Sequence, residues 1–80
     1  MPKLRSLSGD DLLHVFSRFE FHKVSQKGSH VKLRRESGSN RQTLTIPMHR
    51  EVDKGTLRAI FRQALRYIPE ADLYVYFFAD

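Results

Sequence analysis

The sequence predicts a small α+β sandwich, in which a three-stranded antiparallel sheet carries helices on one face and leaves the other face open. Two short segments alternate apolar and polar residues, as half-buried strands do, and a later segment repeats apolar residues at helical spacing. Turn-forming residues separate the strand segments closely, which favours antiparallel hairpins. Eighty residues allow one small core, so residues 1–80 are expected to form a single domain.

The first expected element is a helix over roughly residues 9–20. Ser8 is a favourable N-cap residue, and Asp11 three positions later makes a near capping box. Apolar residues then follow at helical spacing, namely Leu12, Leu13, Phe16 and Phe19.

Three strands should follow, at 21–26, 29–36 and 42–46. Lys27-Gly28 is expected to form the first tight turn, and the cluster Ser37-Gly38-Ser39-Asn40 the second. Leu44 and Ile46 alternate with threonines and should face the core, and Pro47 should end the third strand.

An amphipathic helix is predicted after the sheet. Its apolar positions repeat at i, i+3, i+4, i+7, i+8 and i+11, namely Leu57, Ile60, Phe61, Ala64, Leu65 and Ile68. Arg58, Arg62 and Arg66 align on its polar side. Pro69 fits the first position of a last short helix, although the run Tyr74–Phe78 has strand propensity as well. Propensity does not decide between these two structures for the tail.

Charge is unevenly distributed along the chain. Residues 23–66 hold eleven Lys and Arg against three acidic residues, whereas residues 1–22 are balanced and residues 67–80 hold acidic residues only. A basic middle suits a polyanionic partner such as RNA, DNA or an acidic protein, although a solubilising surface has the same composition. The chain has no cysteine, so a disulfide or a thiolate metal site is excluded. We also expect an intracellular, cytoplasmic protein, because no segment resembles a signal peptide or a membrane span.

The strand at 29–36 contains the strongest candidate for chemistry. Its alternation directs Val31 and Leu33 inward, and it directs His30, Lys32 and Arg34 into solvent. An imidazole can exchange a proton near neutral pH, and two cations beside it suit reactions at a phosphodiester. The alternative is an ordinary surface histidine.

Several other residues have both a functional and a purely structural interpretation. Gly28-Ser29 either lets a phosphate approach the backbone or only closes a hairpin. His49 is either a second functional group or a loop residue, and His14 and His22 are interpreted as surface histidines. A metal site at His30 and His49 is disfavoured because no carboxylate or thiol ligand is suitably spaced. The arginine row of the later helix matters only if it borders the open face of the sheet.

The motif order closely resembles the HicA (YcfA-like) toxin family over about residues 4–72. Four segments carry this resemblance: Leu7-Ser8-Gly9-Asp10-Asp11-Leu12, Phe21-x-x-Val24-x-x-Lys27-Gly28-Ser29-His30, Ile46-Pro47-Met48-His49 and Lys54-Gly55-Thr56-Leu57-Arg58-x-Ile60. The resemblance implies a double-stranded-RNA-binding-domain-like fold, mRNA interferase activity and a HicB antitoxin that silences the toxin. It places the catalytic histidine of the Gly-Ser-His motif on His30.

The chain departs from the family pattern at two places. Glu20 stands where a glycine commonly precedes the first-strand aromatic residue, so the helix is expected to end without a left-handed cap. The tail from Leu73 to Phe78 is more aromatic than is typical of the family.

Together these observations predict a metal-independent endoribonuclease that needs no cofactor and whose partners are RNA and a HicB-like antitoxin. His30 is the expected catalytic residue. The expected RNA-binding residues are Lys27, Gly28, Ser29, Lys32 and Arg34, with His49, Arg58 and Arg62 as secondary candidates. Two other interpretations stay open, a non-catalytic RNA-binding module of the same fold and a module that binds an acidic protein.

Overall fold

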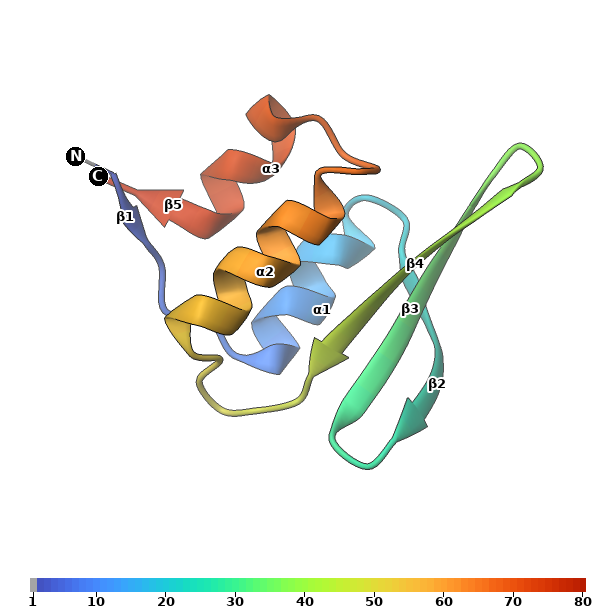
Figure 1. The fold of residues 1–80 in the computed structure, drawn as a ribbon, viewed down its shortest axis with the longest axis horizontal. Helices are drawn as coiled ribbons and strands as arrows, with labels where there is room; N and C mark the ends of the chain where they lie inside the picture. The colour runs from blue at the N-terminus through green and yellow to red at the C-terminus, as the bar shows by residue number, and fades with distance from the viewer. Residues whose placement is uncertain (1) are drawn as a thin grey trace.

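A three-stranded sheet and the helices that cover one of its faces form the body of the molecule (Figure 1). The structure, a computed structural model, describes residues 2–80. Its elements in chain order are β1 (Lys3–Leu4), α1 (Gly9–Ser17), β2 (His22–Lys27), β3 (His30–Ser37), β4 (Asn40–Pro47), α2 (Lys54–Ala64), α3 (Glu70–Phe77) and β5 (Phe78–Ala79). The expected α-β-β-β-α arrangement, that of a double-stranded-RNA-binding domain, is confirmed.

The sheet is antiparallel throughout, in the order β2-β3-β4. Each hairpin closes with a two-residue turn, Gly28-Ser29 and Gly38-Ser39, and the first turn therefore lies one residue later than expected. Both glycines have positive φ values, 58° and 61°, which side-chain-bearing residues rarely adopt. Glycine at the first central position is typical of the hairpin turns that match strand twist.

Strand β3 has the alternation that its sequence predicts. Val31 and Leu33 are 1% and 2% exposed, whereas His30 and Lys32 are exposed to solvent. The two buried residues join a core built from α1, α2, α3 and the inner face of β3 and β4. No helix within residues 2–80 covers the opposite face of β3 (Figure 1).

Strand β2 is an exposed edge that deviates from a regular ladder. Its pairing with β3 shifts between Lys23 and Ser25, so Val24 is the extra residue of a bulge and is 46% exposed. Lys23 is paired with the buried Leu33, yet it stays exposed and donates to Gln26 Oε1 at 2.7 Å. A bulge and an inward lysine both discourage another chain from pairing with an edge strand.

Helix α1 ends at Ser17, earlier than its apolar spacing indicates. The expectation of no left-handed cap is wrong, because Glu20 itself has a positive φ of 68°. The N–H of Phe21 then donates to the carbonyl of Phe16 at 3.0 Å, and the two rings pack edge to face. This contact pattern is that of a glycine-capped helix end, which here is adopted by a glutamate.

The aromatic tail contains both of the structures considered for it. α3 runs to Phe77, with Pro69 just before its first helical residue, and β5 then pairs antiparallel with β1. This small ribbon brings the two ends of the chain together (Figure 1). The pairing was not anticipated, because strands of two residues show no periodicity.

Arg35 joins the ends of both covering helices to the sheet. Its guanidinium donates to the carbonyls of Phe19 and Tyr67 at 3.0 and 2.8 Å, and to Gln42 Oε1 at 2.8 Å. It also lies 4.8 Å from the centre of the Phe21 ring. Arg35 therefore holds the helices against the inner face, while Arg34 beside it belongs to the open face.

Candidate nucleic-acid interface

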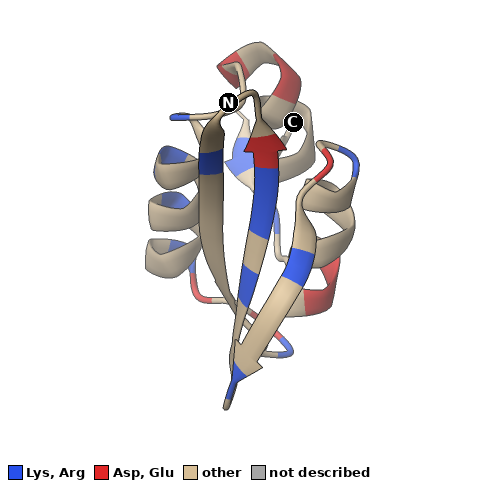
Figure 2. Ribbon diagram, turned by 90° about the vertical axis from the view of Figure 1, so that its right-hand side faces the viewer, with Lys and Arg blue, Asp and Glu red and all other residues tan. Residues whose placement is uncertain are grey.

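The open face of the sheet carries three rows of paired residues across β2, β3 and β4. His30 lies opposite Lys27 and Pro47. The next row along β3 places Lys32 opposite Ser25 and Thr45, and the row after that places Arg34 opposite His22 and Thr43. Figure 2 views the sheet from this side and shows Lys and Arg on all three strands. The predicted group of His30, Lys32, Arg34 and Lys27 is thus brought together on one surface.

The cations near His30 have no acidic partner among residues 2–80. The ion pair on this part of the structure joins Arg41 to Glu36 at 3.6 Å, at the far end of the hairpin. Lys27, Lys32 and Arg34 form no ion pair within the described chain, and no hydrogen bond there fixes the His30 imidazole. An exposed imidazole beside unpaired positive charge is a suitable environment for an incoming polyanion.

The turn before His30 is open on its outer side. A Cβ placed on Gly28 would meet no atom within 4 Å. Glycine is therefore favoured at this position by its positive φ and not by crowding. The turn is braced from below, because Gln26 Nε2 donates to the Gly28 carbonyl at 3.0 Å. Gly28 and Ser29 therefore present an uncovered backbone next to the imidazole.

Two further segments lie against this turn. The Met48 N–H donates to the Ser29 carbonyl at 2.6 Å, and the Gly9 N–H donates to the His49 carbonyl at 2.9 Å. A Cβ on Gly9 would lie 2.6 Å from the Pro47 carbonyl oxygen, so this approach requires glycine. The start of α1, the Gly-Ser-His turn and the loop after β4 thus converge. Gly9 is a residue whose role the sequence analysis missed, because no residue pattern shows a backbone contact of this kind.

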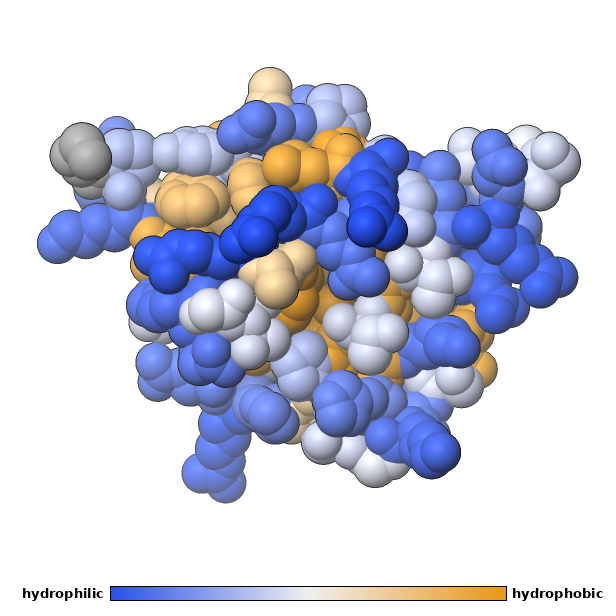
Figure 3. All heavy atoms as spheres, in the orientation of Figure 1, coloured by the Kyte–Doolittle hydropathy of each residue, from blue (hydrophilic) through white to orange (hydrophobic). Residues whose placement is uncertain are grey.

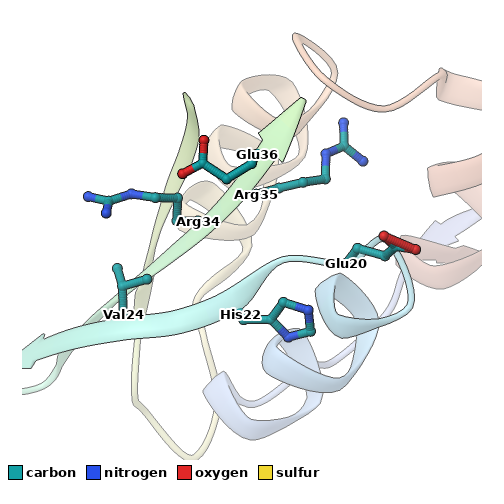
Figure 4. Close-up of a pocket in the computed structure, with 6 residues that line it drawn as sticks. All are labelled: Glu20, His22, Val24, Arg34, Arg35 and Glu36. Atoms are coloured by element: carbon teal, nitrogen blue, oxygen red, sulfur yellow. The ribbon is translucent and has the colours of Figure 1, made fainter. Parts of the chain in front are cut away.

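A shallow hollow of about 450 Å³ lies between the start of β2 and the later part of β3, away from His30 (Figure 4). It is lined by Glu20, His22, Val24, Arg34, Arg35 and Glu36. Figure 4 shows Arg34 and Arg35 leaving opposite sides of β3. His22, interpreted from sequence as a surface histidine, therefore belongs to a concave surface, which the bulge at Val24 helps to form.

Arg34 is the second notable feature of this hollow. Its Nε atom is buried and has no hydrogen-bond partner within residues 2–80. A buried donor without a partner costs about 1–3 kcal/mol, and an anion bound there would supply the missing acceptor.

The arginine row of α2 lies away from these residues. Arg58, Arg62 and Arg66 are exposed, and Figure 2 shows the Lys and Arg bands of α2 beside β4, around the edge of the sheet. In the space-filling view the side of α2 that faces the reader is strongly hydrophilic, with hydrophobic surface next to it toward α3 (Figure 3). The row flanks the open face without forming part of it.

No three His, Cys, Asp or Glu side chains of residues 2–80 are grouped as metal ligands would be. None of the helices seen in this range has the length and apolar character required to cross a bilayer.

Comparison with known proteins adds the family to this geometry. A family model described as the HicA toxin of bacterial toxin–antitoxin systems matches residues 9–65. The match begins with α1 and ends just after α2, and it includes the Gly-Ser-His turn and the loop after β4. The searches of curated proteins and of solved structures gave no significant match. Because the matched region is well over half of the sequence, the chain belongs to the HicA toxin family of bacterial toxin–antitoxin systems.

Proposed function

We propose that this toxin is an mRNA interferase, an endoribonuclease that cleaves RNA phosphodiesters with His30 as its catalytic residue and without a metal ion. The observation that carries the proposal is the exposed His30 imidazole on the same face of β3 as Lys32 and Arg34, which have no acidic partners in the described chain. Membership of the HicA family supports it. The RNA would be met in the cytoplasm.

His30 would act by transferring a proton. A base removes the proton of the ribose 2′-hydroxyl, or an acid protonates the departing 5′-oxygen, and imidazole can do either near neutral pH. Lys32 and Arg34 would stabilise the charge that develops on the phosphate oxygens. Lys27 and the uncovered backbone of Gly28-Ser29 would contact the phosphate next to the cleaved bond.

The hollow around Arg34 supports binding of RNA beyond the cleaved bond. The free Nε of Arg34 needs an acceptor, and a phosphate oxygen is a suitable one. Successive residues on one strand face are about 6.6–7 Å apart, so Lys32 and Arg34 can contact phosphates outside the reacting group.

A HicB-like antitoxin would silence the toxin by covering the same face. An inhibitor that competes with RNA must bury His30, and acidic side chains would complement Lys32 and Arg34. Arg58 and Arg62, which flank the sheet on α2, would extend the basic surface toward such a partner.

The test is cleavage of a labelled single-stranded RNA in EDTA by the wild-type protein and by His30→Ala. We expect the wild type to cut and His30→Ala to bind the RNA with similar affinity without cutting it, because His30 is exposed and its loss leaves no cavity. Circular dichroism should show that both are folded. A folded wild type that binds RNA but does not cut would favour a non-catalytic RNA-binding module. A His30→Ala protein as active as the wild type would contradict the assignment of His30.

A further inference from the structure

His49 follows the end of β4, next to the turn that precedes His30. Ile46 and Pro47 at the end of β4 are both buried, Pro47 pairs with His30, and Met48 packs against the core. His49, two positions after the end of β4, is exposed to solvent.

The loop that carries His49 is fixed by backbone hydrogen bonds at three points. Met48 N–H donates to the carbonyl of Ser29, the neighbour of His30, at 2.6 Å. The carbonyl of His49 itself accepts from Gly9 at 2.9 Å, and Val52 N–H donates to the Leu7 carbonyl at the same distance. The backbones of the two histidine segments are therefore held next to each other, and only the side chains are free to adapt to a substrate.

We propose that His49 is a second catalytic residue and that it forms an acid–base pair with His30. The proposal rests on the proposed ribonuclease function, which leaves one of the two proton transfers without a donor or acceptor. A pair of imidazoles held on adjacent backbone segments supplies both.

The reaction balances with two histidines. One neutral imidazole takes the 2′-hydroxyl proton while the 2′-oxygen attacks phosphorus. The bond from phosphorus to the 5′-oxygen breaks, and the other imidazole, protonated beforehand, gives its proton to that oxygen. The products are a 2′,3′-cyclic phosphate and a 5′-hydroxyl, and the two histidines have exchanged protonation states.

Charged residues of both signs adjoin the two histidines, either in the sheet register or in the sequence. Lys27 on β2 and Arg50 in the loop are positive, and Asp10 at the start of α1 and Glu51 in the loop are negative. The remaining acidic group nearby, Asp11, accepts the backbone N–H of Ser8 at 2.9 Å as part of the α1 cap. Residues of both signs thus adjoin the two exposed histidines.

The test is the pH–rate profile of RNA cleavage by wild type, His49→Ala and His49→Gln. We expect the wild-type cleavage rate to rise and then fall with pH. In both variants the rate should fall by about 10²–10⁴-fold, and either the rising or the falling limb of the pH–rate profile should disappear. RNA affinity should change by no more than a few fold. His14→Ala is the matched control, because His14 is an exposed histidine on α1 whose Nδ1 lies 3.0 Å from the Asp10 carbonyl, and it should keep both limbs.

Two results would overturn the role of His49. One is a wild-type rate in His49→Ala, and the other is a reduced rate with both limbs retained, which is the behaviour of a group that only positions the RNA. A wild-type protein that does not cleave RNA would instead contradict the proposed function, so the two failures are distinguishable.

A substrate with sulfur in place of the bridging 5′-oxygen tells which histidine is the acid. Sulfur departs without being protonated, so the variant that lacks the general acid should regain its rate on this substrate. We expect restoration of either His30→Ala or His49→Ala, but not of both. Restoration of both variants, or of neither, would contradict a two-histidine pair.

Discussion

Glu20 holds a backbone conformation that an L side chain adopts at a cost. Its φ of 68° lets the chain turn from α1 into β2, and the turn is held by the Phe21 N–H bond to the Phe16 carbonyl. Glu20 forms no ion pair within residues 2–80 that would offset the cost of this conformation. The family's usual glycine would avoid the strain that a Cβ introduces here.

Replacing Glu20 by glycine should therefore stabilise the protein. We expect the free energy of unfolding to rise by about 1 kcal/mol, since relief of left-handed strain outweighs the added freedom of the unfolded chain. Urea unfolding measures it, with Glu20→Ala as the control that removes the carboxylate but keeps the Cβ. A Glu20→Gly protein no more stable than Glu20→Ala would show that the conformation is not strained.

At the scale of elements, Arg35 determines how the helices meet the sheet. It is the residue through which β3, the end of α1 and the end of α2 are joined by charged hydrogen bonds to backbone carbonyls. Lysine offers no planar fork and cannot satisfy the same carbonyls.

Arg35→Lys should consequently destabilise the fold by about 2–4 kcal/mol, because the buried ends of two helices lose their donors. The matched control is Arg41→Ala on the same hairpin, whose exposed ion pair with Glu36 should contribute no more than about 0.5 kcal/mol. Thermal or urea unfolding compares the two. Equal effects would mean that Arg35 does not join the layers.

Two aspartates at the helix N-termini make the stability of the fold depend on pH. The side-chain hydrogen bond from Thr56 lowers the pKa of Asp53 at the start of α2, and the backbone N–H of Ser8 lowers the pKa of Asp11 at the start of α1. A carboxyl whose pKa is lower in the folded state stabilises the fold above its unfolded pKa of about 3.9, and this stabilisation is lost as the pH falls further.

Asp53→Ser should flatten part of this acid dependence. Serine keeps a capping oxygen for α2 but does not titrate. We expect the variant to lose less stability than the wild type between about pH 5 and pH 2. Urea unfolding at several pH values provides the comparison, and identical slopes for the two proteins would contradict the role of the Asp53 cap.

Elements were predictable from sequence where periodicity extends over several residues. The alternation from His30 to Arg34 predicts the open face of the sheet, and the apolar repeat that starts at Leu57 predicts α2. Both patterns arise because each element is buried on one side only. The end of α1 was misplaced because Phe19 continues the helical spacing although the backbone has already turned. The place of His22 in the hollow depends on the bulge at Val24, and the approach of Gly9 to Pro47 depends on backbone packing. Neither leaves a pattern in the sequence.

At the scale of the whole molecule, charge is separated between two regions. The open sheet face and α2 each carry several basic residues, while Glu70 and Asp72 lie in the first turn of α3 (Figure 2). A polyanion should therefore approach the sheet rather than the α3 end.

Binding of single-stranded RNA should show this asymmetry in its salt dependence. Lys32→Ala and Arg34→Ala should each weaken binding and reduce the slope of log K against log salt by about 0.7, one released counterion each. Arg66→Ala, at an exposed position in the turn after α2, should leave the slope unchanged. Fluorescence anisotropy at several salt concentrations measures the slopes, and equal slopes for all three variants would place the RNA elsewhere.

The central claim is that the His30 imidazole performs chemistry on RNA at an open surface. Its most direct test is chemical rescue, in which imidazole is added to His30→Ala and cleavage of a labelled RNA is followed in EDTA. We predict that cleavage is lost in the variant and partly restored as imidazole is added, because the site left by an exposed side chain admits the free base. Imidazole should cause much less RNA cleavage when no protein is present or when the double variant His30→Ala/Lys32→Ala replaces His30→Ala. Undiminished cleavage by His30→Ala alone, or no response to imidazole beyond the protein-free control, would contradict the account.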